Sequence, residues 1–122
     1  MSEIKDYKDL LIWQKGIDIA EQCYFLTKKY AKEELYGMVQ QIRRSATSIS
    51  ANIAEGYGRR YSQEYIRFLN ISQGSINELE THLIISVRVN LCGRQDIEPT
   101  IRLLHEESKM INALIKKIKL KN

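Results

Sequence analysis

Two histidines and the carboxylates near them are the side chains of this chain best suited to binding a metal. Helical bundles that hold two metal ions in a carboxylate site need a Glu-x-x-His motif on two helices and a further glutamate on each of the others. Here Glu78 precedes His82 by four residues, and the residue three places before His105 is Arg102. The spacing therefore predicts no metal site.

The glycines Gly56 and Gly58 would suit a loop that binds phosphate. In a P-loop, however, the glycines follow a strand and lead into Gly-Lys-Ser/Thr. Gly58 is followed by Arg59 and Arg60, and no strand pattern precedes Gly56. None of the serines lies in a strand–turn–helix elbow that would expose a nucleophile. We therefore expect no catalytic residues and no cofactor, and predict that the protein is not an enzyme.

Basic side chains are concentrated in two zones and offer a different chemistry. Residues 41–70 carry five arginines and two acids, and residues 108–122 carry five lysines and no acid. Arginines contact phosphates, and tyrosines among them, here Tyr57 and Tyr61, can stack on unpaired bases. The candidate nucleic-acid-binding residues are Arg43, Arg44, Arg59, Arg60, Arg67, Lys116 and Lys117.

Two simpler interpretations of these charges stay open. Arg43 and Arg44 could instead pair with acids such as Glu55, Glu78 or Glu80, an alternative that weighs more for Arg44. The C-terminal lysines could merely complement the negative end of a helix dipole and aid solubility.

Length and composition favour a single helical domain. A chain of 122 residues with 43% hydrophobic and 28% charged residues is typical of a globular domain with its own core. One proline and six glycines leave long uninterrupted segments, which favour helices over strands. The sequence contains no stretch expected to span a membrane or to act as a signal peptide. Cys23 and Cys92 are isolated, so we expect free thiols in a reducing cytoplasm.

Apolar residues recur at helical spacing in four segments. These are predicted to be helices at about residues 10–30, 33–55, 62–91 and 96–120. The second segment has the 4–3 spacing of helices that pack side by side, at Leu35, Val39, Ile42, Ala46, Ile49 and Ile53. Asp9 and Ser62 are expected to cap helix starts, and Gly56 and Gly93 to follow helix ends. Short links make neighbouring helices antiparallel, so we predict an all-α, up-down-up-down antiparallel four-helix bundle.

A second line of side chains on the second helix is mostly uncharged, where a solvent-facing line would be rich in lysine and glutamate. The third helix has a similar line that includes Gly74, and a mid-helix glycine costs about 1 kcal/mol relative to alanine. That cost suggests that another backbone approaches closely. We expect the two lines to be hydrogen-bonded to each other or across a subunit interface; a mildly polar surface is the alternative. The candidate packing or oligomer-interface residues are Ser45, Ser48, Asn52, Glu55, Gly74 and Glu78.

Three strings of residues resemble the small bacterial four-helix-bundle proteins encoded in intervening sequences of 23S ribosomal RNA. The strings are YGMVQQIRRSA at 36–46, SISANIAEG at 48–56 and GSINELET at 74–81, and LLIWQK at 10–15 also fits. The resemblance covers essentially the whole chain. The sequence departs from the family pattern at Ala31 and Ser50, and neither departure threatens the fold.

The resemblance implies a homopentamer without catalytic residues. It also implies similarity to the accessory variability proteins of diversity-generating retroelements, which bind nucleic acid and a reverse transcriptase through a basic surface. We therefore predict a non-enzymatic, oligomeric, cytoplasmic bundle that binds RNA or DNA through its arginines, with an affinity that falls steeply with salt. The alternative is a protein-interaction scaffold or accessory subunit without direct nucleic-acid binding, and an enzyme is the third possibility.

Overall fold

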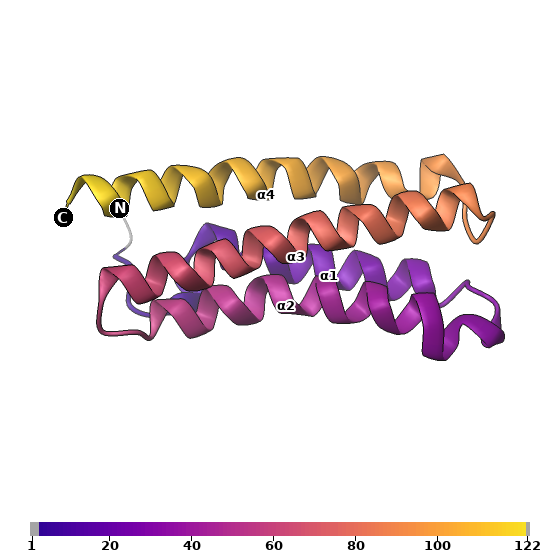
Figure 1. Cartoon of the computed structure of the whole chain (residues 1–122), viewed down its shortest axis with the longest axis horizontal. Helices are drawn as coiled ribbons and strands as arrows, with labels where there is room; N and C mark the ends of the chain where they lie inside the picture. Colours follow the sequence, from indigo (N-terminus) through magenta and orange to yellow (C-terminus); the bar gives the residue numbers. More distant parts are fainter. Residues whose placement is uncertain (1–2, 122) are drawn as a thin grey trace.

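The computed structural model describes residues 3–121, which form four long helices running alternately up and down (Figure 1). They are α1 (Leu11–Thr27), α2 (Gln40–Tyr57), α3 (Ser62–Arg88) and α4 (Arg94–Leu120). Three short segments complete the order: η1 (Tyr7–Asp9), η2 (Lys32–Glu34) and η3 (Leu35–Val39). Each helix contacts its neighbours in sequence, and α1 also contacts α4. The prediction of an antiparallel four-helix bundle is confirmed.

Branched aliphatic side chains fill the space between the helices. Ile42, Ile49 and Ile53 of α2 are fully buried against residues such as Leu79 of α3 and Leu104 of α4. Burial of this kind contributes about 1.5–3 kcal/mol for each large aliphatic side chain. None of the helices within the described residues is long and apolar enough to cross a bilayer.

The second helix begins at Gln40, later than predicted. Gly37 has φ −112° and ψ −109°, which are not helical values, and the turn around it is a π-type turn. This kink removes Leu35 from the predicted apolar seam, and its side chain is 46% exposed. The first helix likewise ends at Thr27 and not near residue 30.

Neither predicted N-cap residue caps its helix: Asp9 lies in the preceding short segment η1, and Ser62 is one residue too late. Asp9 belongs to η1, where its carboxylate accepts from the backbone N–H groups of Lys5 and Asp6, and these bonds lower the pKa of its carboxyl. Ser62 is the first residue of α3, and Tyr61 takes the cap position without a capping hydrogen bond from its side chain.

The two predicted C-terminal glycines have other roles. Gly56 lies inside α2, and Gly58 is the residue at which that helix ends. Gly93 precedes α4, where its N–H donates to the Asp96 carboxylate at 2.7 Å. The left-handed residue after α3 is Asn90, with φ 66°. The helices therefore end at Gly58 and near Asn90, and α4 begins after Gly93, at positions that the spacing of apolar residues does not predict.

Candidate nucleic-acid interface

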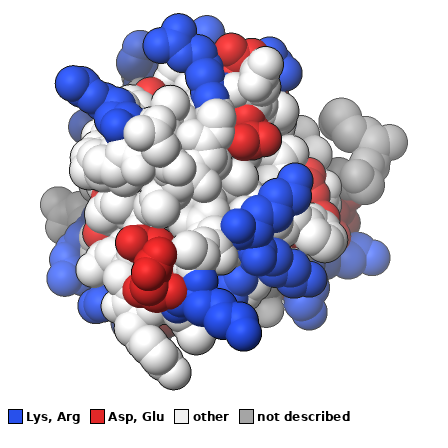
Figure 2. All heavy atoms as spheres, turned by 90° about the vertical axis from the view of Figure 1, so that its right-hand side faces the viewer, with Lys and Arg blue, Asp and Glu red and all other residues white. Residues whose placement is uncertain are grey.

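The two basic zones of the sequence meet at one end of the bundle. The link between α2 and α3 lies at the same end as the C-terminus of α4, and the described chain both begins and finishes there (Figure 1). The exposed side chains that this topology gathers are Arg59, Arg60, Arg67, Lys116, Lys117, Lys119 and Lys121, which we call the basic end. The opposite end shows basic and acidic side chains interleaved (Figure 2).

A phenylalanine positions two arginines of the basic end. The Arg59 guanidinium lies 4.8 Å from the centre of the Phe68 ring, and the Arg67 guanidinium lies 5.4 Å from it. Arg59 is also 2.6 Å from the Glu55 carboxylate. Stacking on an aromatic face holds a guanidinium in place while leaving its N–H groups able to donate.

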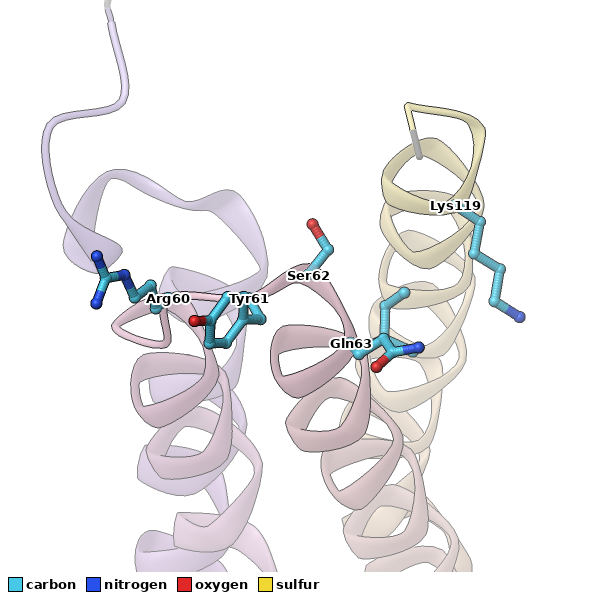
Figure 3. Close-up of a pocket in the computed structure, with 6 residues that line it drawn as sticks. Arg60, Tyr61, Ser62, Gln63 and Lys119 are labelled. Atoms are coloured by element: carbon cyan, nitrogen blue, oxygen red, sulfur yellow. The ribbon is translucent and has the colours of Figure 1, made fainter.

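Arg60 differs from these two because it does not lie over the Phe68 ring, and like Arg67 it forms no ion pair with any residue in the range 3–121. It lines a hollow of about 750 Å³ together with Tyr61, Ser62, Gln63, Ile66 and Lys119. Figure 3 shows Arg60, Tyr61, Ser62, Gln63 and Lys119 spread across the open end of the bundle, with Arg60 at one side and Lys119 of α4 at the other. This shape suits a polymer lying across the surface better than an enclosed small substrate.

A second, smaller hollow at the basic end is apolar. Its volume is about 270 Å³, and it is lined by Leu10, Tyr57, Tyr65 and Leu114 among others, with Lys117 and Lys121. The Tyr57 and Tyr65 rings meet edge to face at 6.1 Å. Burial, with a smaller effect of Tyr57, raises the pKa of the Tyr65 phenol to about 12, so this ring stays neutral.

Arg43 and Arg44 lie far from the basic end. They begin α2, whose rise of about 1.5 Å per residue places them about 24 Å from Arg59 along the helix. The Arg43 Nε donates to the Thr27 hydroxyl at 2.9 Å, and its guanidinium lies 4.4 Å from the centre of the Tyr24 ring. Arg43 therefore joins α2 to α1.

Arg44 is exposed, and the suggested pairing with nearby acids is not observed. Glu55 contacts Arg59, Glu78 lies 3.5 Å from His82, and Glu80 lies 3.1 Å from His105. Each of the three carboxylates thus has another partner, and the pairing alternative for Arg44 was wrong.

The candidate packing residues of α2 and α3 fall into two sets, one buried or half-buried (the inner set) and one exposed (the outer set). Ser48 shares a 2.8 Å hydrogen bond with Ser75 of α3, and the Asn52 amide donates to the Ser48 carbonyl and hydroxyl. Ser45 is only 2% exposed and donates to carbonyls of its own helix. Ser48 therefore bonds across to α3, whereas Ser45 and Asn52 bond within α2.

The outer set is Glu55, Gly74 and Glu78, all exposed. A Cβ atom at Gly74 would meet nothing within 4 Å. The close approach of another backbone expected there does not occur among residues 3–121.

The sequence matches a known protein family over most of its length. Residues 8–113 match the family described as 23S rRNA-intervening sequence protein. The chain belongs to that family. The suspected resemblance is confirmed, and the family description names no reaction.

A solved structure has the same fold as this 23S rRNA-intervening sequence protein. It is a crystal structure of a protein of unknown function from the S23 ribosomal protein family of Bacteroides thetaiotaomicron VPI-5482. It is 28% identical, with a TM-score of 0.77 over 87% of this chain and 99% of that chain. No curated protein matches the chain.

The two histidines of the chain lie in separate pairs, each with a glutamate. His82 is near Glu78 on the same helix, whereas His105 of α4 contacts Glu80 of α3. Across residues 3–121 no three potential metal-ligating side chains come together.

Sequence reasoning missed one buried acid. Glu107 of α4 is fully buried, and neither carboxylate oxygen has a hydrogen-bond partner among the described residues. It faces the point where α1 passes α2, since a Cβ at Gly16 would lie 3.4 Å from Glu107 Oε2 and 3.1 Å from Ser50 Cβ. Glu107 lies three residues after Leu104 and four before Ile111, both buried, and this helical spacing could have predicted that Glu107 is buried as well.

Proposed function

We propose that this protein binds RNA or DNA through its basic end and acts by binding and not by catalysis. The supporting observation is the convergence of two basic zones that are far apart in the sequence. The last turns of α4 bring Lys116, Lys117, Lys119 and Lys121 to the link that carries Arg59 and Arg60.

The contact we propose is mainly with phosphates. Arg59 and Arg67 are held over the Phe68 ring, and Arg60 and Lys119 line the open hollow from two different elements. Cations on an open surface neutralise a nucleic-acid backbone without reading its sequence. Each neutralised phosphate releases counterions, so affinity depends strongly on salt.

Reversing two charges at the basic end is expected to weaken binding. The variant Arg60→Glu with Lys119→Glu should bind at least about tenfold more weakly near 0.1 M salt, because two phosphate contacts become repulsive. The slope of log affinity against log salt should also become shallower by roughly 0.9 for each duplex phosphate that the variant no longer neutralises. Gel shifts with a structured RNA and with duplex DNA at several salt concentrations measure both effects.

Arg44→Glu is the matched control, because Arg44 is also exposed and unpaired but lies at the other end of α2. It should bind nearly as the wild type does. An equal loss of affinity in this control, or no binding by the wild type even at low salt, would contradict the proposal. Pull-downs that then recover protein without nucleic acid would favour the scaffold.

We also propose that the molecule self-associates through the outer face of α3, as a pentamer if the family resemblance extends to assembly. Ile71, Gly74, Glu78 and Ile85 are spaced by three, four and seven residues and lie along one exposed side of this helix. Isoleucines at both ends of this line would be removed from water in an interface. Gly74 would allow a second helix to approach closely, which gives a reason for a residue costing about 1 kcal/mol in a helix.

Placing a large charged side chain on this face should dissociate the assembly. Gly74→Arg leaves the fold of a single chain intact, because nothing lies within 4 Å of the new Cβ. Sedimentation should show the wild type as a multiple of the 14.3 kDa chain and the variant as the single chain. Ala113→Arg, at an exposed position of α4, should keep the wild-type mass. A wild type that sediments as one chain would rule the interface out.

A further inference from the structure

We propose that the basic end holds an unpaired nucleotide, with its base in the small apolar hollow beside Tyr57 and Tyr65 and its phosphates against Lys117 and Lys121. The inference rests on the proposed nucleic-acid binding and specifies the form of nucleic acid that is bound. It predicts a single strand, a loop or a bulge as the preferred target.

The size and lining of the hollow suit one planar ring. Its volume of about 270 Å³ is slightly below the roughly 300–1,000 Å³ of sites for drug-sized ligands, so a duplex or a protein helix would not enter. Its walls are formed by four aliphatic side chains and two aromatic ones, which are Ile4, Leu10, Leu114, Ile118, Tyr57 and Tyr65. Aromatic walls of this kind stack on any base, because every base has a π face.

The charges in the lining suit a ligand that is both aromatic and anionic. Lys117 lies in the last turn of α4 and Lys121 directly follows that helix, and among residues 3–121 no carboxylate lines the hollow. Along the same last turns, Lys119 lines the larger hollow with Arg60. A strand that places a base in the apolar hollow therefore finds further cations for its neighbouring phosphates.

Tyr61 is the competing aromatic site, and the structure separates it from Tyr57. Tyr61 is 67% exposed and lies on the open surface with Ser62 and Gln63 (Figure 3). A base stacked there would keep most of its contact with water. The apolar hollow removes more base surface from water and is the better site.

Filling the hollow without changing its charge tests the inference. Fluorescence anisotropy at one salt concentration would compare a single-stranded RNA, a single-stranded DNA of the same sequence and the corresponding DNA duplex. The wild type should bind the single strands about tenfold more tightly than the duplex, as expected for one stacked base. Leu114→Trp should reduce single-strand affinity to the duplex level, whereas Ala113→Trp, at the exposed neighbouring position, should not.

Two further measurements locate the base. A 5-iodouridine strand should photocrosslink to Tyr57 or Tyr65, and Tyr57→Ala should weaken single-strand binding more than duplex binding because one aromatic wall is lost. Binding of either strand supports the site, and the ratio of RNA to DNA affinity measures the contribution of the 2′-hydroxyl. Equal duplex and single-strand affinity, an unaffected Leu114→Trp with wild-type melting, or crosslinking confined to Tyr61 would overturn the inference while leaving the basic end intact. Absence of all nucleic-acid binding in the wild type would instead remove the proposed function.

Discussion

Gly56→Ala is expected to lower the free energy of unfolding by about 1 kcal/mol net, because overpacking of a tight contact costs roughly 1–3 kcal/mol. A Cβ atom at this position would lie 2.7 Å from the Phe68 Cβ and 3.1 Å from the Tyr65 Cδ1. It would also lie 3.3 Å from the Tyr65 carbonyl oxygen, so backbone as well as side chains would have to shift. The gain in helix propensity, about 1 kcal/mol, offsets only part of this cost.

Urea unfolding of wild type, Gly56→Ala and Gly58→Ala measures this effect. Gly58 is the matched control, because the nearest atoms to a Cβ there are 3.7 and 3.8 Å away, at ordinary contact distance. Its midpoint should stay close to that of the wild type. If both glycine variants unfold at the same urea concentration, α2 and α3 do not pack as closely at Gly56 as described.

The same contact connects stability to the basic end. Phe68 carries the ring over which Arg59 and Arg67 lie, and Tyr65 lines the apolar hollow. A shift of Phe68 away from position 56 would therefore move both arginines. Gly56→Ala should weaken nucleic-acid binding even under conditions where it remains folded.

The stability of the protein is expected to fall as pH rises from about 4.5 to about 8, because of Glu107. Burial raises the pKa of its carboxyl from 4.5 to about 8, against a smaller opposing effect of Lys15. Between these two values the folded chain holds a proton that the unfolded chain has released. The folded state is therefore favoured at low pH, and the advantage declines by at most about 1.4 kcal/mol per pH unit until both states are ionised.

Comparison with Glu107→Gln isolates this contribution. Glutamine has nearly the same shape and no titration, so the variant should show a flatter pH dependence and, above pH 8, a stability higher than wild type by a few kcal/mol. Urea unfolding at pH 5, 6.5 and 8 measures the difference. All other titrating groups are common to both proteins and cancel. Parallel pH profiles for the two proteins would show that Glu107 is not held protonated.

The core of this bundle could be predicted from spacing, because buried apolar residues repeat with the helical period. Ile42, Ile49 and Ile53 were expected in the core and are fully buried. Leu35 obeys the same period but is exposed, because the kink at Gly37 depends on backbone geometry that side-chain periodicity does not encode. Helix ends were poorly predicted for a similar reason, since Gly58 and Asn90 act through local backbone conformation.

The candidate site was only partly predictable. Local sequence placed Arg43 and Arg44 in one group with Arg59 and Arg60, whereas the antiparallel topology separates the two pairs by the length of α2. The same topology brings Lys119 close to the link, although more than fifty positions separate the two in the sequence. Glu107 was missed because a charged residue at a seam position is normally assigned to the surface.

The location of the chain ends has a practical consequence for experiments. The described chain begins and finishes beside the basic end, so a tag or fusion partner joined to either terminus will emerge next to the surface proposed to bind nucleic acid. A polyhistidine or acidic tag there would alter the local charge and compete with the ligand. The exposed link at Asn90 lies at the other extremity of α3, about 40 Å away at about 1.5 Å per residue. Dyes, immobilisation chemistry and inserted peptides are best attached at that link.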